Sequence, residues 1–139
     1  MNKTTLHWSY LNIKDVPMDL FLYEELQEIY LKQNFITSIP NWLLNLTNLR
    51  FIHLAGNNLI SLPEELYLLE NLDFLDVSNN KLTELPLSIG LVSSLQRFNV
   101  SDNQITEIPK GTQVLNATAN YFEKLISCRN WSSQTSWRT

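Results

Sequence analysis

The sequence predicts an α/β solenoid, a horseshoe-shaped stack of coils with a parallel sheet on its concave side and short helical or 3-10 turns on its convex side. Three observations in the 139 residues predict this fold. A leucine-based pattern recurs every 23 residues, beginning at Leu26, Leu49, Leu72 and Leu95. Each period contains a short alternation of apolar and polar residues, which is typical of a strand. Each period also contains a proline that is followed by apolar residues at helical spacing.

Seven positions of the period hold the same kind of residue in four successive periods. Five of these columns are apolar, one is asparagine and one is proline. The apolar columns are Leu26/Leu49/Leu72/Leu95, Ile29/Ile52/Leu75/Phe98, Leu31/Leu54/Val77/Val100, Ile36/Leu59/Leu82/Ile105 and Ile39/Leu62/Leu85/Ile108; the others are Asn34/Asn57/Asn80/Asn103 and Pro40/Pro63/Pro86/Pro109. Such a repeat predicts one continuous stack in which each coil contacts its neighbours.

The first part of each period has the alternation of a half-buried strand. In the second period Ile29 and Leu31 are expected to point inward, while Glu28, Tyr30 and Lys32 point outward. Because every period runs in the same direction, the strands should pair in parallel, about 4.8 Å apart.

The asparagine column falls where the chain must leave the sheet. A side-chain amide carries both donors and acceptors, so it can satisfy the backbone groups that the turn leaves unpaired. Asn34, Asn57, Asn80 and Asn103 are therefore predicted to form a structural ladder.

The proline column begins the outer half of each coil. Pro63 with Glu64 and Glu65 predicts a short helical turn in which proline takes the first helical position and carboxylates lie near the N-terminus. The apolar positions that follow should close the core from the convex side; they are Leu43/Leu66/Ile89 and Leu46/Leu69/Val92.

The pattern LxxLxLxxNxLxxLPxxLxxLxx, which residues 49–59 and 62–66 match almost position for position, resembles the leucine-rich repeats of intracellular Ras-suppressor-like and scribble-like proteins. The resemblance covers residues 26–109 and implies a leucine-rich repeat horseshoe. It also implies partners among small GTPases, phosphatase subunits or signalling scaffolds.

The period predicts an irregular first repeat at 3–25, repeats at 26–48, 49–71 and 72–94, and an incomplete repeat at 95–116. Leu6, Trp8 and Val16 lie one period before Ile29, Leu31 and Ile39, but Leu11 occupies the asparagine column. Terminal repeats are often atypical because one face meets water.

Residues 117–139 depart from the pattern and allow two interpretations. In the first, a short amphipathic helix that includes Tyr121, Phe122, Leu125 and Ile126 caps the open end and a disordered tail follows. In the second, the tail is an alternative or truncated end of a longer solenoid.

Composition excludes several classes of function. A net charge of −4 argues against binding to nucleic acid, because that would favour a basic face. The single cysteine, Cys128, provides neither an internal disulfide nor a multi-thiolate metal site. The sequence shows no secretory leader and no stretch long enough to span a membrane. We expect a soluble, cytoplasmic, monomeric protein with no membrane insertion, no cofactor and no metal.

The residues suited to catalysis are few, so no enzymatic activity is expected. Cys128 has no histidine near it in the sequence. His53 and Asp76 occupy equivalent outward positions in adjacent repeats and should be neighbours on the sheet. A hydrogen-bonded pair there would resemble an acid–base dyad, but without a visible nucleophile a surface pair or a partner contact is the better interpretation.

The outward strand residues vary between repeats while the core columns do not, and they include aromatic residues beside mixed charge, as interface hot spots do. The predicted partner-binding residues of the concave face are Tyr30, Phe51, His53, Phe74, Asp76, Arg97 and Asn99. In the alternative interpretation, Phe51 and Phe74 merely extend the core.

A rigid, preformed surface limits the entropy lost on binding, so the sequence predicts a non-catalytic scaffold for protein–protein interaction in intracellular signalling. Two alternatives remain. The chain could be the substrate-recognition part of a larger enzyme such as a ubiquitin ligase, or a truncated, competitive form of a longer leucine-rich repeat protein.

Overall fold

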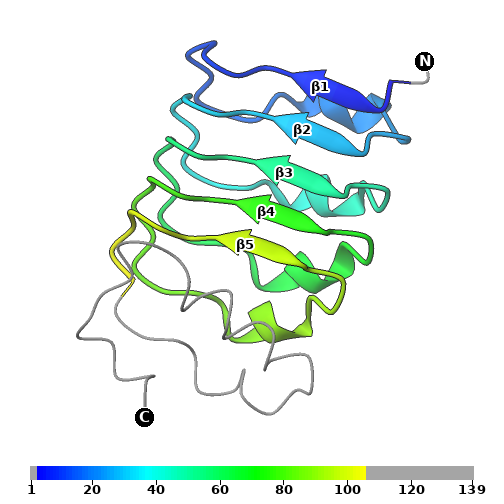
Figure 1. The fold of residues 1–139 in the computed structure, drawn as a ribbon. Helices are drawn as coiled ribbons and strands as arrows, with labels where there is room; N and C mark the ends of the chain where they lie inside the picture. The colour runs from blue at the N-terminus through cyan, green and yellow to red at the C-terminus, as the bar shows by residue number, and fades with distance from the viewer. Residues whose placement is uncertain (1–2, 106–139) are drawn as a thin grey trace.

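Residues 3–105 are described by the computed structural model, and they form a regular alternation of strands and 3-10 helices (Figure 1). The elements in chain order are β1 (Thr5–His7), η1 (Met18–Leu22), β2 (Glu28–Tyr30), η2 (Asn41–Asn45), β3 (Phe51–His53), η3 (Glu64–Leu68), β4 (Phe74–Asp76), η4 (Leu87–Leu91) and β5 (Arg97–Asn99). Each of the first four coils consists of a strand, an outward turn, a 3-10 helix and a return to the sheet. The predicted α/β solenoid is confirmed.

The five strands of the described region form one parallel sheet in the order β1-β2-β3-β4-β5. Partner residues are one 23-residue period apart throughout, as in the pair of Leu6 with Ile29 and the pair of Ile52 with Leu75. Strand β1, in the irregular first repeat, keeps this register. The cap and tail predicted at 117–139 lie outside the described residues, and the repeat boundaries themselves stay a prediction.

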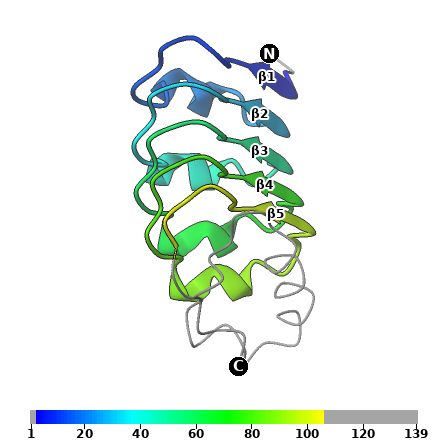
Figure 2. The same ribbon diagram turned by 60° about the vertical axis from the view of Figure 1, so that its left-hand side comes forward.

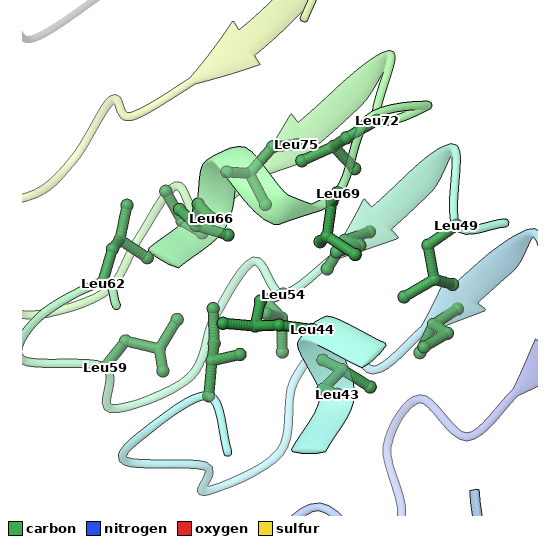
Figure 3. Close-up of a cluster of buried hydrophobic side chains, with 14 of the residues drawn as sticks. Leu43, Leu44, Leu49, Leu54, Leu59, Leu62, Leu66, Leu69, Leu72 and Leu75 are labelled. Atoms are coloured by element: carbon green, nitrogen blue, oxygen red, sulfur yellow. The ribbon is translucent and has the colours of Figure 1, made fainter. Parts of the chain in front are cut away.

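The core lies between the sheet and the 3-10 helices, which occupy opposite sides of every coil (Figure 2). Strand residues such as Ile52 and Leu75 are fully buried, and so are Leu66 and Leu69 from the convex side. Figure 3 shows these leucines meeting in the middle of the coils. The outer apolar columns therefore close the core as predicted, and each coil buries its side chains against the next.

The first coil is closed partly by aromatic residues. Trp8 and Tyr23 occupy the columns that hold Leu31 and Leu46 one period later, and both pack, partly buried, against the core. Leu6 and Leu20 are almost completely buried even in this terminal coil.

The asparagine side chains join each coil to the one before it. The Oδ1 of Asn57 accepts a hydrogen bond from the backbone N–H of Ile36 at 3.0 Å. Its Nδ2 donates to the carbonyls of Leu31 and Leu54, both at 2.9 Å. Asn34, Asn80 and Asn103 make equivalent bonds. The amides thus satisfy backbone groups that the turn would otherwise leave unpaired.

Proline precedes each 3-10 helix rather than starting it, so the predicted position was wrong by one residue. Pro40 has φ −70° and ψ 146°, which is extended backbone, and Pro63 is similar. The carbonyl of Pro40 accepts the first bond of the helix from the N–H of Leu43 at 3.1 Å. Proline therefore fixes the chain direction ahead of the turn and leaves the helix itself to other residues.

A second structural column lies directly before the asparagine column, and it was not predicted from the sequence. Tyr10, Gln33, Gly56, Asn79 and Asp102 all have positive φ, between 54° and 72°. This left-handed conformation is easy for glycine and tolerable for asparagine and aspartate, but it costs other residues roughly 1 kcal/mol. Glycine, asparagine and aspartate recur at this repeat position, and this recurrence could have predicted the left-handed backbone.

We predict that Asn57→Ala lowers the free energy of unfolding by about 2 kcal/mol or more, because it leaves buried backbone donors and acceptors unpaired. Asn58→Ala is the matched control, since its side chain makes no hydrogen bond within residues 3–105. The control should change stability by less than about 0.5 kcal/mol. Urea unfolding measures both variants, and equal losses would contradict a structural role for the ladder.

We predict opposite effects at two equivalent positions of the left-handed column. Gln33→Asn should stabilise the fold by about 0.5 kcal/mol, because asparagine tolerates positive φ better than glutamine does. Gly56→Ala should destabilise it by about 1 kcal/mol or more, because a Cβ there is strained and would meet the Gln33 side chain. Thermal unfolding of both variants checks the signs; a stabilising Gly56→Ala would contradict this account.

Candidate functional site

The outward residues of the strands bring five rings together on the concave face. We name His7, Tyr30, His53, Phe74 and Phe51 the aromatic row. His7 stacks on Tyr30 with 4.6 Å between ring centroids, and Tyr30 stacks on His53 at 4.2 Å. His53 meets Phe74 at 4.6 Å, and Phe74 meets Phe51 at 6.1 Å. Three of these contacts join register partners on adjacent strands, which lie about 4.8 Å apart, whereas His53 meets Phe74 diagonally.

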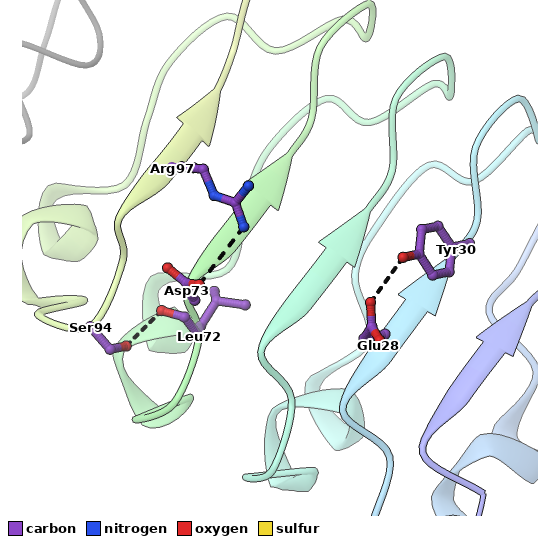
Figure 4. A network of polar contacts seen from close by, with 6 residues as sticks. All are labelled: Glu28, Tyr30, Leu72, Asp73, Ser94 and Arg97. Atoms are coloured by element: carbon purple, nitrogen blue, oxygen red, sulfur yellow. Dashed lines mark hydrogen bonds and ion pairs between the residues drawn. The ribbon is translucent and has the colours of Figure 1, made fainter.

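Tyr30, in the middle of the row, is held by a carboxylate. Its hydroxyl donates to Oε1 of Glu28 at 2.9 Å (Figure 4). The hydroxyl of Thr5 donates to Oε2 of the same residue at 3.3 Å. The hydrogen bond to Glu28, with burial and the charge of Glu28 as smaller causes, raises the pKa of Tyr30 above its ordinary value. Both oxygens of Glu28 are therefore occupied within the protein.

His53 lies between the rings of Tyr30 and Phe74. Its Nε2 is buried and has no hydrogen-bond partner in the described part of the chain. Burial lowers the pKa of His53 below its ordinary value; the charge of Asp76 opposes this shift, and that of Lys32 adds to it. His53 is thus held as a neutral ring in an aromatic stack.

His53 and Asp76 are register partners, as predicted, but no hydrogen bond joins them. Oδ1 of Asp76 instead accepts from the N–H of Ser78 at 3.0 Å and from its hydroxyl at 2.7 Å. One strand further, Asn99 holds Ser101 in the same way. The carboxylate is therefore directed toward Ser78 of its own chain rather than toward His53 on the next strand. The geometry therefore contains no acid–base dyad at these residues.

Phe51 and Phe74 carry arginines on their outer surface. The guanidinium of Arg97 lies 4.8 Å from the centroid of Phe74 and 5.5 Å from that of Phe51. The guanidinium of Arg50 lies 5.7 Å from Phe51. Both rings are half-buried and stand on the face opposite the leucine core. Their burial comes in part from each other and from arginine rather than from the core.

The sequence placed Arg97 in the candidate site but missed Arg50. Arg50 directly precedes Phe51, outside the alternating positions assigned to the concave face. Its long side chain nevertheless reaches the ring of Phe51. The signal was a basic residue next to an outward aromatic residue, since arginine often stacks on such rings.

Within residues 3–105 no group of three histidine, cysteine or acidic residues is arranged to hold a metal ion. In the same part of the chain no helix has the length and apolar character needed to cross a membrane. Cys128 lies outside the described residues.

We predict that the protein becomes less stable as the pH is lowered, because of His53. As the pH falls below the ordinary pKa of 6.5, the unfolded chain binds a proton at this residue more readily than the folded chain, whose pKa is lower, so protonation favours unfolding. Lowering the pH from about 7.5 to about 5.5 should therefore reduce Tm more in wild type than in His53→Gln. Equal slopes in wild type and His53→Gln would contradict the prediction.

Comparison with known proteins supports the repeat pattern. A family model described as leucine-rich repeats in two copies matches residues 24–68, and a single leucine-rich repeat model matches residues 71–91 and 94–115. No curated protein matches the chain by sequence.

Three solved structures are similar in fold. A leucine-rich repeat protein of Leptospira interrogans is 33% identical over 84% of this chain, with a TM-score of 0.67. The BIR2 ectodomain of Arabidopsis thaliana is 26% identical over 74% of the chain, with a TM-score of 0.66. The BIR3–SERK2 complex of the same plant gives 25% identity over 78% of the chain and a TM-score of 0.68.

The chain spans only 28% of the Leptospira protein, 57% of the BIR2 chain and 61% of the matched chain of the BIR3–SERK2 complex. The similarity is therefore to a stretch of repeats in each of these proteins and not to their full length. The family models, the parallel sheet and the solved structures agree on one conclusion: the chain belongs to the leucine-rich repeat proteins.

Proposed function

We propose that the chain is a non-catalytic scaffold for protein–protein interaction, which binds a partner protein through the concave face of its sheet. The observation that carries the proposal is the aromatic row with its two stacked arginines. Tyrosine and arginine are enriched among the residues that dominate binding energy at interfaces. Here they lie beside two half-buried phenylalanines on the face of the sheet opposite the leucine core.

Preorganisation supports the same proposal. Ordering flexible side chains on binding costs about 0.5–1.5 kcal/mol for each one. Tyr30 is already fixed by Glu28, and Arg97 is already stacked on Phe74. His53 is clamped between two rings. Binding of a partner would therefore cost little further side-chain entropy, because folding has already ordered these side chains.

The family supports a binding role as well. Leucine-rich repeats are typical of interaction modules, and one of the similar solved structures is a complex of BIR3 with SERK2. The resemblance to the Ras-suppressor-like and scribble-like group leads us to propose a cytoplasmic monomer in intracellular signalling. Its partner would be a small GTPase, a phosphatase subunit or a signalling scaffold.

We predict that the double variant Phe51→Ala/Phe74→Ala weakens partner binding about 100-fold or more, because each removed ring is worth roughly 2 kcal/mol at a hot spot. Partners are captured with the full chain, and their Kd is then measured by calorimetry. The matched control is Tyr67→Ala/Leu68→Ala on the convex side, where the side chains are 42% and 45% exposed.

The control variant should bind as wild type does. Equal binding by both double variants would place the interface elsewhere and contradict the proposal. A collapse of Tm in the phenylalanine variant would show instead that both rings belong to the core, as the alternative interpretation from the sequence holds.

A further inference from the structure

Both arginines of the described region lie at one corner of the concave face. We name Arg50, Phe51, Phe74 and Arg97 the arginine corner. Arg97 reaches across from β5 and lies over both rings, while Arg50 reaches the ring of Phe51 beside it. The ring of Phe51 thus carries two guanidinium contacts. Stacking on rigid rings holds each guanidinium in place, although both side chains are exposed.

Neither guanidinium makes a hydrogen bond within residues 3–105, although Arg97 is ion-paired with Asp73. Arg97 faces Asp73, but the two charged groups are 3.8 Å apart, which is too far for a hydrogen bond (Figure 4). The Arg97 side chain remains 59% exposed. The side chain of Arg50 makes neither an ion pair nor a hydrogen bond within residues 3–105. Each guanidinium has five N–H donors in a planar fork, and this corner leaves them available to a ligand.

The acidic groups of the same face are in the opposite condition. Both oxygens of Glu28 accept hydrogen bonds, from Thr5 and Tyr30. Oδ1 of Asp76 accepts two bonds from Ser78. Glu28 and Asp76 are therefore satisfied largely by neighbouring hydroxyl and N–H groups. Among the described residues Asp73 alone is paired with Arg97, at 3.8 Å, so Arg50 and the exposed edge of Arg97 remain accessible to an incoming group. This is notable in a chain whose net charge is −4.

The chemistry of the corner selects a carboxylate. A stacked guanidinium presents its edge, and two parallel N–H bonds from that edge match the two oxygens of a carboxylate. The rings of Phe51 and Phe74 offer an apolar surface directly beside this position. The two arginines of this corner, in a chain of net charge −4, are too few for a nucleic-acid backbone, whose binding needs many phosphate contacts.

We propose that the arginine corner binds an aspartate or glutamate side chain of the partner, with an adjacent apolar side chain of the same segment on Phe51 and Phe74. This inference rests on the proposed function of the concave face and names the chemistry of the segment that occupies it.

The probe is a library of random unphosphorylated peptides displayed against the full chain. Peptides that require Phe51 and Phe74 are selected, and their affinities are measured by fluorescence anisotropy. The selected peptides should share an aspartate or glutamate next to an aromatic or aliphatic residue. Arg97→Gln and Arg50→Gln should each weaken binding about tenfold or more, and Arg97→Lys should recover part of the loss. Raising the salt concentration should weaken binding to wild type more than to Arg97→Gln.

The matched control is Lys81→Gln, which removes one exposed positive charge away from the corner and should bind as wild type does. In the peptides, replacing the acidic residue by its amide should cost as much as Arg97→Gln does. Combining both changes should cost little more, since they remove the same contact.

Different failures separate the two proposals. Selected peptides without an acidic residue, or full affinity in Arg50→Gln and Arg97→Gln, would overturn the carboxylate assignment and leave the concave face as the interface. Tighter binding of a phosphoserine peptide than of its aspartate counterpart would also overturn it. If no selected peptide requires Phe51 and Phe74, this inference and the proposed function both fail.

Discussion

Hydrogen bonding between coils, through one asparagine amide in each coil after the first, is the constraint on which the rest of the structure depends. Each amide accepts from and donates to the backbone of the preceding coil, as Asn57 does with Ile36 and Leu31. These bonds satisfy buried polar groups and also fix how far one coil is displaced from the next. With the displacement fixed, the strands can pair only in register, and every position of the period becomes a row across the sheet.

Because of this register, one set of residues forms the core and another set forms the surface of the sheet. The leucine columns fill the interior and could be exchanged between coils without changing the surface. The outward rows carry what is individual to this protein. Tyr30 can stack on both histidines, and Arg97 can reach both Phe51 and Phe74, only because identical coils bring non-identical residues to equivalent places. The scaffold and the candidate site are consequences of the same hydrogen-bonded spacing.

Most of the fold could be predicted from the sequence because burial repeats every 23 residues and leaves a pattern; the strands, the core columns and the neighbours on the sheet follow from it. What escaped prediction depends on side-chain direction and backbone detail. The pairing of Asp76 with Ser78 rather than His53 is a local competition that periodicity does not encode. Arg50 reaches the site through the length of its side chain. The left-handed conformation of Gln33 is imposed by the coil on a residue that does not prefer it.

The asparagine bonds also have a direction. Oδ1 of Asn34 accepts the N–H groups of Leu11 and Ile13, and Asn57 does the same for Ile36. In each case the asparagine lies about one period later in the chain than the turn it completes. A coil emerging from the ribosome is therefore left with open backbone groups until the following coil has been synthesised. During translation the coils would fold one after another from the N-terminus. The hydrogen bonds of each turn would be completed about one period behind the newest residue.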